Sequence, residues 1–233
     1  MYQKKKIIIG FSLSDPVNQK AERGITRLIL FINLFLRCDL LFLLPHNHLI
    51  PKFLSGYNVK YFKNDSSLFD FSRYSRIISS DTLSDEDILF AFNDTLGNGR
   101  KFNLGLQFFI YLSFAILFFN FPQKIHFCAP VDKDKDGIWI SPYFFIGKIW
   151  FIKRLNFTNF RKLEALSNDS LKFKLQKWLK NGWRSSRITS LCKKRIKYRT
   201  LLLERSLISE EIIKKNVLRF SRSSFLRIIN SFF

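Results

Sequence analysis

The sequence is poor in the residues that build disulfide-bonded or zinc-bound domains. It contains three cysteines and three histidines among 233 residues, and no C-x-x-C pair occurs. An odd number of widely spaced cysteines argues against a disulfide framework and favours a reducing compartment. Glycine and proline number 9 and 6, and no long Gly/Pro/Ser linker divides the chain.

Long apolar runs are also missing. The longest uncharged one, LGLQFFIYLSFAILFF at 104–119, is shorter than the roughly 20 residues that a spanning helix needs. We therefore expect a buried or interfacial helix there. The opening MYQKKKIIIG has a short apolar run that ends in a turn, so no secretory signal is expected.

Acidic residues are few, with 18 Asp and Glu against 39 Lys and Arg, and the excess of positive charge is uneven. Residues 1–122 hold 14 Lys and Arg against 10 Asp and Glu, a net charge of +4. Residues 123–233 hold 25 against 8, a net charge of +17. This asymmetry predicts that the C-terminal half meets phosphate, nucleic acid or an anionic membrane, the alternative being a merely solvated basic face.

Hydrophobic residues make up 47% of the chain, enough for a sizeable core. Their periodicity predicts strands that alternate with helices, and hence an α/β fold with a Rossmann-like, mostly parallel sheet flanked by helices. Residues 83–94 fit either a helix or a strand. The expected strands are 4–12, 38–45, 57–62, 75–81 and 124–131, and the expected helices are 18–37 and 102–119.

The composition changes near residue 143. We expect an α/β domain over 1–143, followed by a basic, aromatic-rich and mostly helical region over 144–233. Within that region, 159–183 and 209–220 have helical patterns. Ser209 and the two glutamates after it are typical of a helix start.

The most chemically specific stretch is VDKDKDGIWI at 131–140. Its spacing matches the first half of a calcium-binding EF-hand loop, but Tyr143 stands where the loop needs a bidentate Glu. Asp132, Asp134 and Asp136 also form two overlapping Asp-x-Asp pairs after an apolar strand, a pattern that suits Mn²⁺ or Mg²⁺ with oxygen ligands. Lys133 is then placed to contact a phosphate. The alternative is a solvated polar turn.

Further polar residues follow the other expected strands. His46 follows 38–45, and Asp94 ends 83–94; either one is a candidate general base. Arg100 and Lys101 enter the apolar helix 102–119, where exposed N–H groups suit a phosphate. For His126 and Cys128 we favour core packing over metal binding, because no further ligands are placed nearby.

Two features resemble glycosyltransferases. The Asp-x-Asp pairs after KIHFCAPV resemble the motif with which many such enzymes hold a metal and the diphosphate of a nucleotide sugar. The first 65 or so residues resemble the opening strand, helix and strand of retaining two-domain enzymes. Arg23-Gly24-Ile25-Thr26-Arg27 stands where those enzymes often show Gly-Gly-hydrophobic-x-Arg, with one glycine missing. The two features belong to different types of glycosyltransferase, and 233 residues leave no room for a second Rossmann domain.

The resemblance implies sugar transfer from a nucleotide-sugar donor to a surface-glycan or lipid-linked acceptor. A basic, aromatic C-terminal region would suit an anionic membrane surface, so we expect a cytoplasmic protein peripheral to the inner face of the membrane. The competing hypothesis is a non-enzymatic nucleic-acid-binding protein that uses the same basic region. A structural protein without a ligand is a third class.

Overall fold

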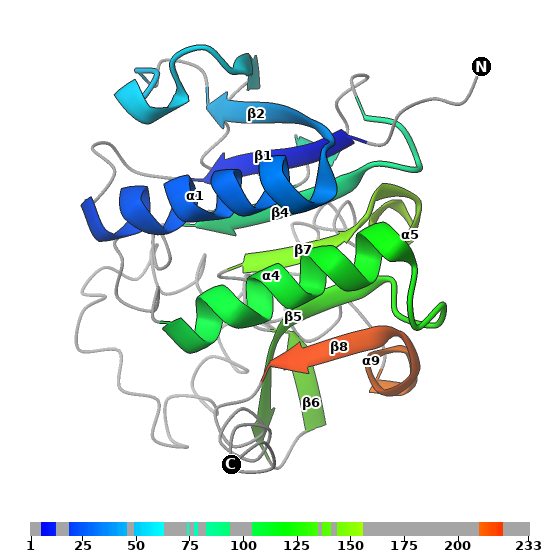
Figure 1. The fold of residues 1–233 in the computed structure, drawn as a ribbon. Coiled ribbons are helices and arrows are strands. Elements are labelled where there is room, and N and C mark those ends of the chain that lie inside the picture. The colour runs from blue at the N-terminus through cyan, green and yellow to red at the C-terminus, as the bar shows by residue number, and fades with distance from the viewer. Residues whose placement is uncertain are drawn as a thin grey trace, which may run out of the picture.

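The fold is α/β, with one mixed sheet flanked by helices (Figure 1). It is seen in a computed structural model that describes residues 6–12, 19–45, 49–62, 74, 77, 78, 83–93, 104–134, 137–140, 144–155 and 210–220. The strands are β1 (Lys6–Ser12), β2 (Asp39–Pro45), β3 (Asn58–Phe62), β4 (Ile88–Asn93), β5 (Phe127–Asp134), β6 (Gly137–Ile140), β7 (Phe144–Lys148) and β8 (Val217–Phe220).

The sheet has a parallel half and an antiparallel half. Its strand order is β3-β2-β1-β4-β7-β5-β6, and β8 pairs with β5. The pairs β3–β2, β2–β1 and β1–β4 are parallel. β7 is antiparallel to both β4 and β5, so β5 runs in the same direction as β4. β8 is parallel to β5 as well.

The central strands are apolar without alternation because both of their faces are covered. Ile7 and Ile9 of β1 pack into the core on one face of the sheet, and Ile8 packs into the core on the other. Phe90 and Phe92 of β4 join the first core, and Leu89 joins the second. A run of bulky apolar residues therefore encodes each inner strand.

Two helices lie side by side over one face of the sheet, α1 (Gln19–Phe31) and α4 (Leu104–Phe119) (Figure 1). A π-helical turn, η1 (Ile32–Leu36), continues α1, and Arg37 ends it with a left-handed φ of 48°. Between β2 and β3 lies the 3-10 turn η2 (Lys52–Leu54). Apart from the helical residues 74, 77 and 78, the remaining described helices are α5 (Ile149–Lys153) and α9 (Glu210–Asn216).

Two of the expected elements are wrong in part. We predict a strand over 75–81, but Ile77 and Ile78 are helical and pack under the second face of the sheet. A short apolar run does not separate a strand from a buried helix. We predict a helix over 209–220, but α9 ends at Asn216 and residues 217–220 form β8.

The strands that follow residue 143 belong to the same sheet as those before it. β7 lies between β4 and β5, and β8 pairs with β5 along Phe127–Pro130. The described part of the basic C-terminal region thus contributes two strands to the sheet of the N-terminal part. The helix expected over 159–183 lies outside the described residues.

Candidate functional site

The carboxyl ends of six strands, β1 to β5 and β8, point to one edge of the sheet. β1, β2, β3 and β4 are mutually parallel, and β5 shares their direction. Figure 1 shows the arrowheads of β1, β2 and β4 on the same side of the molecule. The residues that the sequence singles out come at or just after these strand ends. We call this edge the carboxyl edge.

The three aspartates begin inside a strand. β5 extends to Asp134, three residues beyond the strand end that the sequence predicts at 131. The extension arises because β6 pairs with it: Asp132 lies opposite Trp139, and Asp134 lies opposite Gly137. Asp132 and Asp134 are therefore the last residues of β5 at the carboxyl edge, and Lys133 lies between them. Asp136 lies outside the described residues.

The candidate bases emerge from strands at different distances from β5. β4 ends at Asn93, one residue before Asp94, and one strand, β7, separates it from β5. β2 ends at Pro45, one residue before His46, and three strands separate it from β5. With a strand spacing of about 4.8 Å, the lateral distances from β4 and β2 to the part of β5 that pairs with β7, Phe127 and Cys128, are about 10 Å and about 19 Å. In the strand order, the end of β4 is therefore nearer to β5 than the end of β2 is.

Besides Asp136, four of the residues predicted from the sequence lie outside the described residues, namely His46, Asp94, Arg100 and Lys101. Their placement is known only through the elements that flank them. The segment 94–103 joins the carboxyl end of β4 to the start of α4. Among the residues whose side chains are described, no group of three His, Cys, Asp or Glu is arranged to hold a metal ion. The metal site at 132–136 stays a prediction.

The first turns of α1 add positive charge near the same edge. Arg23 and Arg27 are exposed and lie one turn apart, whereas Gly24 and Ile25 between them are buried against the sheet. The two arginines line a hollow of about 480 Å³ together with Gln19, Glu22 and Thr26. Thr26 Oγ1 donates to the carbonyl of Glu22 at 2.9 Å. Two guanidinium groups here can meet an anion that reaches the carboxyl edge.

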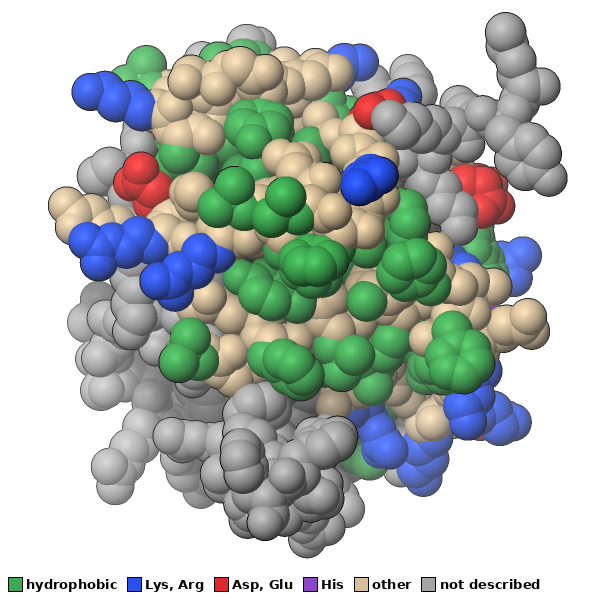
Figure 2. Space-filling model, viewed as in Figure 1, with side chains coloured by type: hydrophobic (Ala, Val, Ile, Leu, Met, Phe, Trp, Pro, Cys, Tyr) green, Lys and Arg blue, Asp and Glu red, His purple; other side chains and the backbone are tan. Residues whose placement is uncertain are grey.

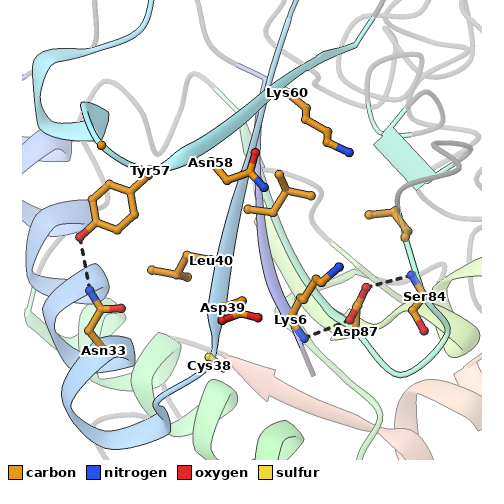
Figure 3. Close-up of a pocket in the computed structure, with 13 residues that line it drawn as sticks. Lys6, Asn33, Cys38, Asp39, Leu40, Tyr57, Asn58, Lys60, Ser84 and Asp87 are labelled. Atoms are coloured by element: carbon orange, nitrogen blue, oxygen red, sulfur yellow. Dashed lines mark hydrogen bonds between the residues drawn. The ribbon is translucent and has the colours of Figure 1, made fainter. Parts of the chain in front are cut away.

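A larger hollow, of about 960 Å³, lies at the opposite edge, where the strands begin (Figure 3). Sequence reasoning missed it, although each strand start there is polar: Lys6 in β1, Asp39 in β2, Asn58 in β3 and Asp87 before β4. The sequence feature that could have indicated this hollow is the charged or amide residue at the start of each apolar run.

The carboxylate of Asp87 is a structural part of this hollow. Asp87 is 2% exposed, and its two oxygens accept hydrogen bonds from the backbone N–H groups of Lys6 at 3.0 Å and Ser84 at 2.8 Å. Figure 3 shows both bonds closing one side of the hollow. Because both of its oxygens are engaged with the backbone, Asp87 ties the 84–87 turn to β1.

Cys128 belongs to the core, which confirms the prediction made for it, whereas His126 is half-buried and packs against aromatic rings. The His126 ring packs at 4.7 Å from Trp150 and 5.6 Å from Phe151, measured between ring centroids. Burial, followed by the nearby Lys148 cation, lowers the pKa of His126. Cys128 is fully buried, and burial raises the pKa of its thiol to about 12. Such a thiol is inert as a metal ligand or a nucleophile.

Comparison of the chain with models of known protein families and with curated proteins finds no match. Within the described ranges, no helix combines the length and the apolar character needed to cross a bilayer. Any assignment of function therefore depends on the geometry of the chain itself.

Proposed function

We propose that this chain is a glycosyltransferase-like enzyme that moves a sugar from a nucleotide-sugar donor to a surface-glycan or lipid-linked acceptor. One observation carries the proposal: β5, which ends in Asp132 and Asp134, runs with β1–β4 and ends at the same edge. In open α/β sheets, ligands bind outside the carboxyl ends of the strands. An acidic pair at this edge is well placed for a diphosphate and its divalent cation.

The parallel half of the sheet supports a Rossmann-like description. Its order, β3-β2-β1-β4, means that the chain moves outward from β1 through β2 and β3 and then returns to the other side of β1. Ligand crevices form at such switch points. Here the switch point lies between Ser12 and Asn93, which are paired at the carboxyl ends of β1 and β4. Asp94 is the next residue after Asn93.

The proposed metal ligands are Asp132, Asp134 and Asp136. Their carboxylates offer the oxygen donors that Mn²⁺ and Mg²⁺ prefer, and the i, i+2 spacing suits neighbouring ligands on one strand. When bound, the metal would neutralise charge that develops on the leaving diphosphate. The β5–β6 pairing supports this role because it holds the first two ligands on a defined backbone.

The proposed phosphate contacts are Lys133, Arg100 and Lys101. The last two precede α4, whose N-terminus faces the carboxyl edge. Backbone N–H groups at a helix start favour anions, and Arg adds a bidentate donor. Of the two candidate bases, the proposal favours Asp94 over His46, because one strand and not three separates the end of β4 from β5.

Thermal unfolding against UDP-, GDP- and CMP-linked sugars, each with and without Mn²⁺, tests the proposal. A ligand at about a hundred times its Kd stabilises the folded state by about 2.7 kcal/mol. For a chain of this size that corresponds to a rise in Tm of roughly 5–10 °C. We expect this rise with one nucleotide, in the presence of Mn²⁺, and its loss in Asp134→Asn.

The matched control is Asp85→Asn, which removes a carboxylate that is 63% exposed and paired with Lys153 near the opposite edge. This variant should keep the full rise in Tm. If no nucleotide sugar shifts the Tm of the wild-type chain, the proposal fails. Salt-steep binding of DNA or RNA that persists in Asp134→Asn would support the nucleic-acid alternative instead.

A further inference from the structure

The outer face of α1, η1 and α4 carries a continuous set of exposed apolar side chains. Phe35 is 68% exposed and Leu104 is 76% exposed, values expected of polar surface residues. Figure 2 shows hydrophobic side chains gathered over these helices. We call this surface the α1–α4 face and define it by Leu34, Phe35, Leu104, Phe108, Leu112 and Phe119.

α4 lacks the polar outer side of a helix that faces water. Two of its polar side chains, Gln107 and Ser113, are buried, and the third, Tyr111, is half-buried. Its outward positions are apolar, and the helix contains no charged residue. Surface helices of globular proteins place polar residues outward and apolar residues inward. The outward side of α4 therefore has the composition of a surface that is covered.

The exposed residues form one surface and not scattered points. Leu104, Phe108 and Leu112 recur every four residues, which places them on one side of α4. The 16 residues of α4 span about 24 Å. Phe31 of α1 stacks on Tyr111 of α4, with ring centroids 4.7 Å apart. This contact joins the two helices into one continuous apolar surface. A patch of this kind on a soluble chain marks an interaction surface.

The charges on the segments that form the α1–α4 face are mostly positive, although Figure 2 also shows a few Asp and Glu side chains at the margins of the view. Residues 19–37 and 104–124 contain one acidic residue, Glu22, and five basic ones. Figure 2 shows Lys and Arg at both ends of the hydrophobic area. The basic residues whose side chains are described are Arg23, Arg27, Arg37 and Lys124, all of them exposed. The surface thus combines a charge-free apolar centre with a basic rim.

The combination of an apolar centre and a basic rim favours one of the possible binding partners of the α1–α4 face. A second copy of the chain would bring another net charge of +21 against the same rim, which is repulsive. Nucleic acid would meet the rim but leave the phenylalanines and leucines without a partner. An anionic bilayer satisfies both parts, because apolar side chains enter the interface while Lys and Arg meet the head groups.

We propose that the α1–α4 face docks on the surface of an anionic lipid bilayer, with both helices lying in the plane of the interface. The helices run alongside the strands, so the carboxyl edge lies at their ends and is not part of the α1–α4 face (Figure 1). The docking surface differs from the basic C-terminal region to which the sequence alone assigns membrane contact. The inference does not depend on sugar transfer.

Co-sedimentation with lipid vesicles tests the inference. We expect the wild-type chain to bind vesicles of phosphatidylcholine mixed with phosphatidylglycerol, and to bind phosphatidylcholine alone more weakly. The variant Leu104→Ser/Phe108→Ser/Leu112→Ser leaves the net charge unchanged. It should reduce the partition coefficient on the mixed vesicles roughly tenfold or more, since three large apolar groups are lost.

The matched control is Leu49→Ser/Ile50→Ser, which removes two exposed apolar side chains between β2 and β3, outside α1 and α4. This control should bind like the wild type. Because Phe108 is 55% exposed, the single variant Phe108→Ser keeps the fold and should show a smaller loss in the same direction. Circular dichroism and Tm report folding of each variant.

Three outcomes would overturn the inference. Equal binding of wild type and triple variant would move the contact to other residues, the basic C-terminal region foremost. Absence of vesicle binding by the wild type would remove the membrane as occupant. A dimer in light scattering that the triple variant disrupts, without vesicle binding, would make a second copy the occupant. None of these outcomes changes the nucleotide-sugar measurement, so the two proposals fail separately.

Discussion

Gly147 of β7 lies directly against the ring of Phe127 in β5. The two residues are paired in the antiparallel register, and a β-carbon added to Gly147 would come within 2.6 Å of Phe127 Cδ2. The same β-carbon would lie 3.1 Å from two side-chain atoms of Ile152. Glycine is therefore required here by packing and not by backbone conformation. The contact holds β7 close to β5 in the centre of the sheet.

Gly147→Ala should destabilise the fold by about 1–3 kcal/mol, because the added methyl group overpacks a filled core. Urea denaturation followed by circular dichroism measures the free energy of unfolding. Phe127→Leu in the same background removes ring atoms at the clash, so the cost of Gly147→Ala should be smaller there. Strict additivity of the two substitutions would contradict the contact.

Asp87→Asn should lower the free energy of unfolding by about 1–3 kcal/mol. The substitution turns one buried acceptor into an amide NH₂ that faces the N–H of either Lys6 or Ser84, so a buried donor loses its partner. Asp85→Asn is the comparison, since its ion pair with Lys153 is exposed and contributes at most about 1 kcal/mol. Equal effects of the two variants in urea denaturation would argue against the role of Asp87.

The stability of the chain should decrease as the pH falls below about 6.5, in part through His126. Burial and Lys148 lower the pKa of His126 in the folded state relative to the ordinary value of 6.5. Below that pH the unfolded chain binds a proton that the folded chain resists, which favours unfolding. His126→Gln removes this contribution. Urea midpoints at pH 7.5, 6.5 and 5.5 should therefore fall less steeply in the variant than in the wild type.

Cys128 should resist alkylation in the folded chain. Burial raises the pKa of its thiol from the ordinary value of 9.0 to about 12, which reduces the thiolate fraction at neutral pH roughly a thousandfold. The side chain is also fully buried. Iodoacetamide followed by peptide mass spectrometry should leave Cys128 unmodified in buffer and modify it in urea. Labelling at the same rate in both conditions would contradict its burial.

The N-terminal half of the fold is largely readable from the sequence. KKKIIIGFS and CDLLFLLP are apolar on both faces, which is the pattern of a covered parallel strand, and they form β1 and β2. The uncharged run at 104–119 predicts α4 to within two residues at its start. For 83–94 the structure selects the strand alternative, because Ile88–Asn93 pairs with β1 on one side and β7 on the other.

The strands that depend on distant partners are not readable. FFIGK becomes β7 only because β4 and β5 leave a place between them. VLRF becomes β8 and not a helical turn because β5 offers an edge, and because His126 N donates to the carbonyl of Asn216 at 3.1 Å. In both segments tertiary pairing overrides local preference.

The candidate site, like the fold, can be predicted from the sequence only in part. Strand order and direction bring the ends of β4 and β5 to one edge, which the α/β pattern and the Asp-x-Asp placement predict. The extension of β5 through Asp134 is not predicted, because Asp and Lys are depleted in strands and only the pairing with β6 explains it. The hollow at the opposite edge follows from four strand starts that are far apart in sequence.

Two strands, β6 and β8, pair with successive parts of the outer edge of β5, and this arrangement affects the chain while it is being synthesised. β6 covers residues 131–134 of that edge, and β8 covers residues 127–130. Val217 leaves the ribosome 83 positions after Asp134, which at 5–20 residues per second is roughly 4–17 s. For that time a nascent chain carries a bare strand edge, the kind that pairs with neighbouring chains. The Lys and Arg residues added after Asp134 give the growing chains a rising positive charge, so nascent chains on one message repel each other increasingly during that interval.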